Sequence, residues 1–304
     1  MALKRNERYP GRFANPSVTH PQGAFQDRSS PTAQDGSYFQ ADWANDWSGF
    51  FESLLSSANI TPDGAVDEVG ASQYFNALGV SMSGRLIKVT PVTVSSSYTP
   101  DPTANKLLVY VTGGGGGGGG SAATDANTRS CGGGGGAGCT VVSMLNVSDI
   151  TFPVNIIIGA AGAPGGAGGL PGGTGGAGGA TLFGSLISSP GGFGGGGGTL
   201  TSDTVPLVAP NGGSSAQPII GNVLNMKGSA GLPGIIGGNA IVSGAGGASF
   251  FGGGGNPIST GSTSPGDQGV LGGGGSGAIT VKSSSTGAAG GRGGTGFVWV
   301  WEYV

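Results

Sequence analysis

The sequence predicts a mainly β and irregular fold, in which short N-terminal helices precede a glycine-rich domain of β-strands and packed polyproline II (polyglycine II) helices. Two observations support it. The segment before residue 86 holds 8 of the 71 glycines, and the rest of the chain holds the other 63. Apolar, strand-like runs separate the glycine tracts at 107–111, 154–158 and 297–301. Because a flexible Gly/Ser linker would not contain such runs, we expect two domains, 1–85 and 86–304.

Residues 1–36 predict an extended arm. They are rich in Pro, Arg, Asn and Ser and show no periodicity. Such a segment is either a disordered terminus or an arm that becomes ordered against a partner. Large side chains such as Tyr9 and Phe13 keep both interpretations open.

Residues 38–58 predict an amphipathic helix, because aromatic and aliphatic residues recur there three and four positions apart. Asp42 and Asp46 lie toward its start, where the helix dipole favours acidic side chains. One helix cannot bury so wide an apolar stripe alone, so the stripe packs either on the rest of the chain or between copies. We favour self-association around a three-fold axis through Phe39, Trp43, Trp47, Phe50, Phe51 and Leu54.

Two further changes of pattern follow. A second, short helix is predicted for 66–78, with Gly79 and Gly84 marking its end and the start of a linker. From Leu86 the apolar period becomes two, which predicts strands at 86–94 and 106–111 joined by a turn at 98–103.

The glycines of 159–180 come in pairs every three residues, with one slip at Leu170-Pro171. Three residues per turn is the period of a polyproline II helix, which has no internal hydrogen bonds. Glycine loses the most freedom on folding, and close backbone-to-backbone bonding between tracts would offset that cost. We therefore expect this segment to bond other tracts such as 194–198 and 272–275.

Loops of ordinary composition leave these tracts. They are either solvated turns or recognition loops on a rigid scaffold, and they span 121–130, 181–190, 199–226, 256–268 and 282–286.

The chain lacks the residue patterns of an enzyme. Its one histidine, His20, lies in the arm, whereas a Ser-His-Asp site needs a histidine held against both partners. No His, Cys, Asp and Glu cluster has metal-ligand spacing, and the acidic residues of the glycine-rich part are too spread for paired-carboxylate chemistry. Glycine-rich phosphate motifs arise by chance in such a chain, and no helix is expected after Gly159. We expect no catalysis, cofactor or metal.

Net charge and hydropathy limit the classes of partner that the chain is expected to bind. The net charge is -3 and only 9% of residues are charged, which disfavours nucleic acid. No apolar stretch reaches the roughly 18 residues of a membrane span. Because the N-terminus has no apolar core behind its charges, we expect assembly in a cytoplasm.

Cys131 and Cys139 flank a glycine-rich run that permits a tight disulfide ring. Thiols are expected in a cytoplasm, and a bond can form after release into an oxidising medium. The sequence leaves both states open.

An ordered set of segments carries a family resemblance. They are LLVYVTGGGGGGGG, GGGGGAGCTVVSMLNVSDITFPVNIIIGAAGAPGGAGG, GGTGGAGGATLFGSLISSPGGFGGGGG and GGRGGTGFVWVWEYV. Together they resemble the glycine-rich distal domain of bacteriophage tail fibres, over about 98–304, and DEVGASQYFNAL resembles the attachment end. The chain departs from a long fibre in having no extended shaft.

The resemblance implies a virion protein, a short tail fibre or fibre-tip adhesin assembled in the host cytoplasm. It implies a homotrimer that attaches to other tail or baseplate proteins through its N-terminus. Its loops would contact a bacterial surface glycan or outer-membrane protein. The alternative is a structural cap or connector of the tail tip without receptor contact. An ice-binding protein is disfavoured because the threonines are scattered.

Five residues are candidate receptor contacts, because they lie in the loops or at the edges of the glycine tracts: Phe183, Phe250, Phe251, Asn256 and Asp267. Aromatic rings can stack on a sugar or anchor a protein contact. For each phenylalanine the competing role is to close an end of the core. The loops 199–226 and 256–268 are therefore the main candidates as a set.

Overall fold

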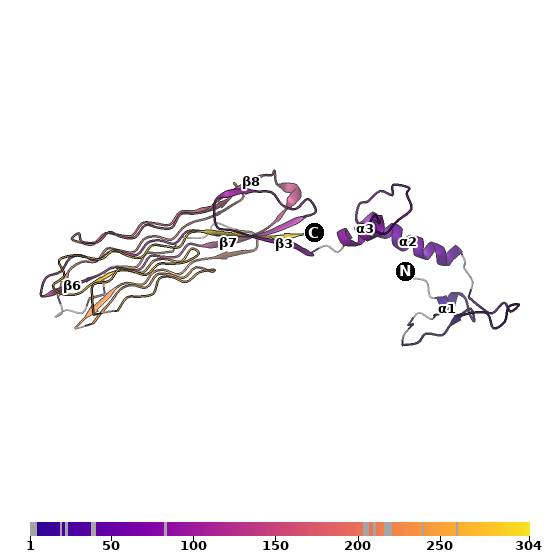
Figure 1. Ribbon diagram of the computed structural model, residues 1–304, viewed down its shortest axis with the longest axis horizontal. Helices are drawn as coiled ribbons and strands as arrows, with labels where there is room; N and C mark the ends of the chain where they lie inside the picture. Colours follow the sequence, from indigo (N-terminus) through magenta and orange to yellow (C-terminus); the bar gives the residue numbers. More distant parts are fainter. Residues whose placement is uncertain are drawn as a thin grey trace. The chain divides into compact units, whose positions relative to one another are not determined.

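The computed structural model describes residues 5–18, 20–21, 24–37, 41–81, 84–202, 207–208, 211–215, 221–238, 240–259 and 261–304. The chain forms two compact units, Met1–Ser83 and Gly84–Val304, which are treated separately (Figure 1). The fold is mainly β and irregular, as the sequence predicts.

The first unit contains a folded arm and two principal helices. Its elements are α1 (Arg5–Arg8), β1 (Phe13–Ala14), β2 (Ala24–Phe25), α2 (Ala41–Ser57) and α3 (Gln73–Ser81). The arm is not extended, because β1 pairs antiparallel with β2. Phe13 is buried, and Phe25 packs edge-on against Trp43 with ring centroids 5.2 Å apart. The arm therefore packs on the helix of its own chain.

The helix predicted at 38–58 is confirmed as α2, but the second begins later than predicted. Residues 66–72 form a loop in which Gly70 has a positive φ of 87°. The Asp67 carboxylate accepts the Gln73 N–H, and the Ser72 hydroxyl accepts the Phe75 N–H. Ser72 thus caps α3 at its N-terminus, and Gly79 lies inside the helix rather than after it.

The second unit begins with two antiparallel sheets, which we call the base. One has the strand order β13-β7-β5-β17-β3 and the other β10-β9-β8-β4. Their strands are β3 (Leu86–Val92), β4 (Ser96–Tyr98), β5 (Lys106–Thr112), β7 (Thr140–Asn146), β8 (Val154–Ile157), β9 (Thr181–Phe183), β10 (Ile187–Ser189), β13 (Leu224–Met226) and β17 (Phe297–Tyr303). A short 3₁₀ helix, η1 (Val147–Asp149), follows β7.

The period-two pattern decides which side chains fill the core of the base. Leu107, Val109 and Val111 of β5 are fully buried, as are Val298 and Val300 of β17. The strands at 86–94 and 106–111 exist as predicted, but they do not pair with each other. The C-terminal strand β17 lies between them and pairs with both.

One carboxylate lies inside this core. Glu302 of β17 has no exposed surface, and it accepts hydrogen bonds from the Tyr98 hydroxyl at 2.9 Å and the Asp101 N–H at 2.8 Å. The Lys88 ammonium lies 3.9 Å from it. Burial and the neighbouring carboxylate raise the pKa of Tyr98. This cluster ties β4 and the turn after it to the last strand of the chain.

Several base strands continue directly into glycine tracts. β5 leads into 113–121, β8 into 159–168 and β10 into 190–198, while β7, β9 and β17 each follow a tract. In Figure 1 these tracts run between the base, marked by β3, β7 and β8, and the opposite end of the unit, marked by β6. We call the bundle of tracts the lattice and its far end the tip.

Tract 113–121 lies inside the lattice. Its consecutive N–H groups donate in rotation to three neighbouring tracts, 131–139, 171–180 and 287–296. Its carbonyls accept in rotation from three others, 159–168, 190–198 and 272–280. Successive residues bond different tracts, and every third residue bonds the same tract again. This is the geometry of a helix with three residues per turn. The predicted polyproline II helices are therefore present, and this one has six neighbours.

Tracts 131–139 and 272–280 are enclosed in the same way, and all three of these central tracts are buried along their whole length. Each central tract bonds the other two. The outer tracts around them are 159–168, 171–180, 190–198, 211–215, 228–234, 242–248, 253–258, 264–270 and 287–296.

The predicted hydrogen bonds from 159–180 to tract 194–198 are confirmed, but those to 272–275 are wrong. Gly172, Gly175 and Gly178 donate to carbonyls of tract 190–198. Tract 272–280 instead occupies a central position and bonds, among others, tracts 113–121, 131–139 and 242–248. A whole tract separates it from 171–180, so sequence period alone could not assign the neighbour.

Short strands close the tip. They are β6 (Thr128–Cys131), β11 (Thr201–Ser202), β12 (Leu207–Val208), β14 (Ile235–Gly237), β15 (Ala240–Val242) and β16 (Ile279–Thr280). They form two three-stranded sheets, β11-β6-β16 and β12-β14-β15. A second small core lies beneath them, made of Cys131, Ile236, Ile241 and Ile279.

Candidate functional site

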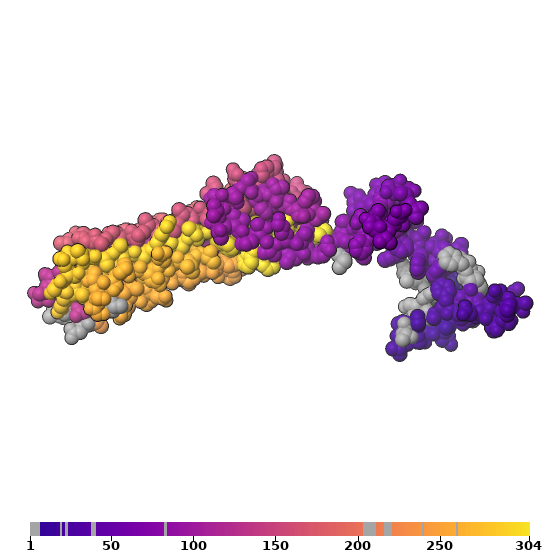
Figure 2. Space-filling model, viewed as in Figure 1, coloured from indigo at the N-terminus to yellow at the C-terminus, as the bar shows by residue number. Residues whose placement is uncertain are grey.

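The tip lies at the opposite end of the second unit from the place where the chain enters it. The entry is at the base, where the Gly84 N–H donates to the Val304 carbonyl and the Val304 N–H to the Arg85 carbonyl. Figure 2 shows the orange and yellow segments side by side along the lattice between these two ends, in agreement with the bonds from Gly269 to Arg292 and from Gly294 to Gly273. Surface loops at the tip are thus held away from the entry point.

Hydrogen bonds fasten the tip loops to one another. The Thr124 N–H donates to the Ser284 carbonyl and the Ser283 N–H to the Asp125 carbonyl, both at 2.8 Å. The Thr263 hydroxyl donates to the Ser284 hydroxyl at 3.1 Å. Three loops that are far apart in sequence are therefore held in one arrangement, which lowers the entropy cost of binding a ligand.

A polar pocket of about 390 Å³ opens among these loops. Its lining comes from four segments of the chain and consists of Arg129, Ala240, Ile241, Ser259, Gly261, Val281 and Lys282. Arg129, Ser259 and Lys282 lie in the predicted loops 121–130, 256–268 and 282–286, but no sequence motif distinguishes them from their neighbours. Their charge and position could have indicated them, because Arg129 and Lys282 are charged loop residues in a chain of which only 9% of the residues are charged.

The predicted receptor contacts do not gather at the tip. The prediction that Phe183 contacts a receptor is wrong. Its side chain has no exposed surface and lies in the base core, 5.9 Å from the Tyr98 ring. It closes the core, the competing role, because it follows tract 171–180 into the base. Phe251 packs against Phe297 and Trp299 of β17, with ring centroids 5.4 and 5.7 Å away. Phe250 beside it is 55% exposed.

Asn256 and Asp267 are neighbours on two outer tracts. The Asn256 backbone N–H and side-chain amide both donate to the Asp267 carboxylate at 3.0 Å. The backbone bond from Asn256 is the main cause that holds the pKa of Asp267 below its usual value. Their hydrogen bonds join the tracts within the lattice, which is a structural role.

The fold agrees with a comparison of the sequence with protein families. A family model described as a glycine-rich domain matches residues 90–303. The chain belongs to this family. A comparison with curated proteins gives no match. Within the residues that the structure describes, no helix is long and apolar enough to cross a bilayer, and no group of three or more His, Cys, Asp or Glu is placed to hold a metal ion.

The geometry of the glycine-rich domain excludes a bond between Cys131 and Cys139. Both are buried, and they lie at opposite ends of tract 131–139. Eight steps of about 3.1 Å separate their Cα atoms by roughly 25 Å, whereas a disulfide needs less than about 7 Å. Burial raises the pKa of Cys131 to about 12 and also raises that of Cys139. Of the two states that the sequence left open, the disulfide between Cys131 and Cys139 is therefore ruled out.

The helical unit offers a second candidate surface, along α2. Trp43 is buried, whereas Trp47 and Phe50 are 56% and 61% exposed. Of the other stripe residues, Phe51 and Leu54 are half-buried, and Phe39 lies outside the described residues. The predicted stripe is therefore partly covered by its own chain.

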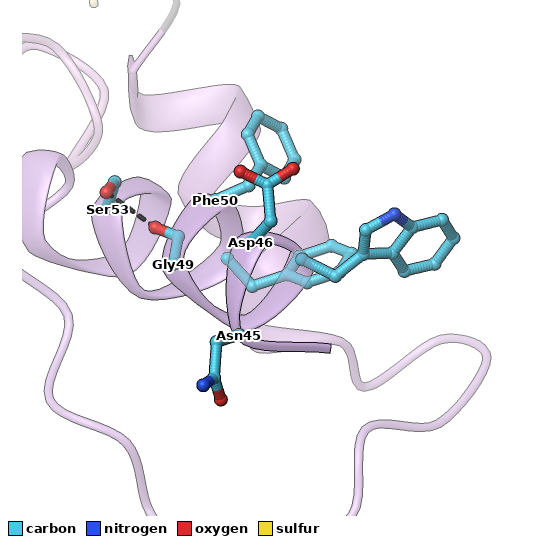
Figure 3. Close-up of a pocket in the computed structure, with 7 residues that line it drawn as sticks. Asn45, Asp46, Gly49, Phe50 and Ser53 are labelled. Atoms are coloured by element: carbon cyan, nitrogen blue, oxygen red, sulfur yellow. Dashed lines mark hydrogen bonds between the residues drawn. The ribbon is translucent and has the colours of Figure 1, made fainter. Parts of the chain in front are cut away.

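Figure 3 shows a pocket of about 800 Å³ on this surface. It is lined by Asn45, Asp46, Trp47, Gly49, Phe50, Phe51 and Ser53. The Ser53 hydroxyl bonds the Gly49 carbonyl one turn back at 2.6 Å, so its polar group is used inside the helix. Among the lining residues, the aromatic Trp47 and Phe50 and the polar Asn45 and Ser53 are exposed, and Asp46 is half-buried.

Proposed function

We propose that this chain is a short tail fibre or fibre-tip adhesin of a bacteriophage. The helical unit would attach it to other tail or baseplate proteins, and the tip loops would contact a glycan or outer-membrane protein of the host bacterium. The observation that carries the proposal is the placement of the tip. Fastened polar loops lie on a rigid lattice, at the far end from the chain entry at Gly84. Binding residues are commonly placed on loops of a rigid scaffold.

The proposal includes a homotrimer in the virion tail, assembled in the host cytoplasm. Its support is the exposed aromatic surface of α2 at Trp47 and Phe50, because contiguous exposed apolar groups mark interaction sites. Sedimentation of the full chain at micromolar concentration tests the trimer. A monomer that persists across the concentration range would contradict it.

A structural cap or connector of the tail tip is the second candidate. It needs the same attachment and the same rigid lattice but no surface contact at the tip. Exchange of loops 123–127 and 282–286 for those of a related fibre separates the two. The adhesin proposal expects a changed host range with an unchanged thermal unfolding curve.

The matched control alters a base-end turn. Leu186 is 45% exposed between β9 and β10, so Leu186→Ser changes an exposed turn far from the tip. We expect it to leave host range unchanged. Loop-exchanged particles with the original host range and adsorption rate would favour the cap.

A further inference from the structure

Helix α3 is apolar over a wider surface than its own chain covers. Tyr74 stacks against Phe51 of α2, with ring centroids 4.7 Å apart, and Ala77 has no exposed surface. Phe75 and Leu78, which lie one turn apart on the same helix, are 74% and 43% exposed. An amphipathic helix normally buries its apolar residues against a partner and exposes its polar ones. Phe75 and Leu78 therefore form an open contact surface.

The loop before α3 is held in one conformation. The Asp63 N–H donates to the Gln73 side-chain oxygen at 3.1 Å, and the Gln73 side-chain amide donates to the Thr61 carbonyl at 3.2 Å. The Asp67 carboxylate accepts the Gln73 N–H at 2.8 Å. Val69, which lies between these two anchors, is fully exposed. A preformed loop thus presents Val69 to solvent, which lowers the ordering cost of binding.

A pocket of about 720 Å³ joins this loop to the exposed part of α3. It is lined by Asp67, Glu68, Val69, Gly70, Ser72, Phe75 and Asn76. Val69 and Phe75 give it apolar surface, and two carboxyl groups lie at the same site. The hydrogen bond from the Ser72 hydroxyl is the main cause that holds the pKa of Asp67 below its usual value, so this group is charged at neutral pH. We call Asp67, Glu68, Val69, Phe75 and Leu78 the α3 surface.

The net negative charge of the chain lies in its first unit. Met1–Ser83 contains nine Asp and Glu residues against five Lys and Arg residues, a net charge of -4. Gly84–Val304 contains six against seven, a net charge of +1. Residues 37–84, which include α2 and α3, hold six of the nine acidic residues and no Lys, Arg or His. The part of the chain that carries the α3 surface is therefore strongly acidic.

This charge distinguishes between the possible occupants of the α3 surface. Complementary charge steers association and favours the correct partner, whereas like charges placed against each other cost free energy. A second copy of the chain would bring the same acidic segment, so the pairing of two α3 surfaces is disfavoured. A partner that carries Lys or Arg beside an apolar side chain matches both the charge and the apolar residues of this surface.

We propose that the α3 surface binds a basic, apolar segment of another tail protein. An apolar side chain of the partner packs against Val69 and Phe75, and flanking Lys or Arg side chains lie near Asp67 and Glu68. The proposal rests on the proposed function for the source of the partner, and it adds the surface and the chemistry of the contact. It leaves the exposed aromatic surface of α2 for contacts between copies.

Titration of the full chain with three synthetic peptides of equal length tests the α3 surface. The probes are a Lys/Leu peptide, a Lys/Gln peptide without apolar side chains and a Glu/Leu peptide without cations, and calorimetry measures each affinity. We expect the Lys/Leu peptide to bind at least about tenfold more tightly than either of the others, because only it matches both charge and apolar surface. Its affinity should fall as salt increases, because screening weakens charge attraction. Equal affinity of the Lys/Leu and Glu/Leu peptides would overturn the proposal.

Single variants show whether the peptide binds at this place. Glu68→Gln removes one carboxylate from the α3 surface, and Phe75→Ser removes an exposed ring. We expect the Lys/Leu affinity to fall about threefold for the first and about tenfold for the second. Asp149→Asn and Val94→Ser are the matched controls, since both change exposed side chains of the second unit, and they should leave the affinity unchanged.

Equal binding by all four variants would contradict the assigned surface. Thermal unfolding curves show whether each variant is folded. The Glu68 side chain is exposed, so Glu68→Gln decides the question by itself if Phe75→Ser does not fold.

Two further measurements separate this proposal from other occupants and from the proposed function. If sedimentation shows that Phe75→Ser dissociates an oligomer formed by the wild type, the α3 surface joins copies of the chain and the proposal is wrong. If the wild type adsorbs to bacteria but does not bind the Lys/Leu peptide, the α3 surface is wrong and the adhesin proposal stands. If the peptide binds but no strain of a bacterial panel adsorbs the protein, the adhesin proposal fails and the α3 surface stands.

Discussion

The central and outer tracts of the lattice have the same backbone geometry but different sequences, and their positions explain why. Tract 113–121 has neighbours on all sides, and eight of its nine residues are glycine. Tract 171–180 has neighbours on one side, and glycine pairs alternate there with Thr174, Ala177 and Ala180, all exposed. A three-residue turn presents every third residue to the same side. In these two tracts the Gly-Gly-X pattern goes with a position at the surface, and the unbroken run 113–120 goes with an enclosed one.

Away from the ends of the central tracts, the residues that replace glycine are small. Ala137 and Ala278 are fully buried, and the buried Ser276 hydroxyl accepts the Asp267 N–H at 2.7 Å. A central position thus tolerates a methyl or hydroxymethyl group only where a gap or a hydrogen bond receives it.

The strongest way to break the comparison is to add one methyl group to each kind of position. A Cβ on Gly117 would overlap the Ala163 carbonyl, while a Cβ on Gly166 would meet no atom within 4 Å. We expect Gly117→Ala to destabilise the domain by more than about 4 kcal/mol, because backbone atoms on packed tracts cannot move aside. Gly166→Ala should be neutral. Thermal unfolding of the full chain measures both, and similar curves would refute the lattice packing.

The same comparison can be sharpened within one glycine pair. A Cβ on Gly175 would overlap the Gly117 carbonyl, whereas one on Gly176 would lie 3.1 Å from the Ala163 nitrogen. We expect Gly175→Ala to destabilise the domain nearly as much as Gly117→Ala and Gly176→Ala to have a smaller effect. Equal effects at both positions would show that the pair does not face two different environments.

A second prediction contrasts the lattice with the base, whose core is made of side chains. Leu107 has no exposed surface, so Leu107→Ala should cost about 2–5 kcal/mol through lost burial and a cavity. The exposed Val94 supplies the control, and Val94→Ala should have little effect. Chemical denaturation reports both values. A loss at Leu107 no larger than at Val94 would contradict the described core.

A smaller effect is expected at the buried carboxylate of the base. Tyr98→Phe removes the hydroxyl that donates to Glu302 Oε1 and leaves the hydrogen bond from the Asp101 N–H to Oε2. An unsatisfied buried acceptor costs about 1–3 kcal/mol. Chemical denaturation at neutral pH should show this loss. An unchanged midpoint would mean that the Tyr98 hydroxyl does not stabilise the carboxylate.

The smallest effect concerns Asp267, which is half-buried. Its pKa in the folded chain is lower than its ordinary value of 3.8, chiefly because the Asn256 N–H donates to it. The resulting stability is present above that value and is lost as the pH falls through the lower folded pKa. Asp267→Asn should therefore weaken the loss of stability below about pH 4. The same acid dependence in both proteins would show that Asp267 does not contribute to it.

The sequence by itself determined the local geometry of this protein. The period of three in 159–180 predicted polyproline II helices, and the apolar run at 297–301 predicted a strand, because both are properties of a single segment. The aromatic spacing likewise predicted α2. The start of α3 was missed, because the capping by Asp67 and Ser72 depends on loop conformation that the apolar period does not report.

Only the tertiary structure decided which segments became neighbours. It placed 272–280 among the central tracts, β17 between β3 and β5, and Phe183 in a core. It also brought Arg129 and Lys282, from separate loops, into one pocket. Glycine tracts carry almost no side chains that could distinguish one partner from another. Their pairing is therefore set by where the base strands and tip turns fix each end, which is information spread over the whole chain.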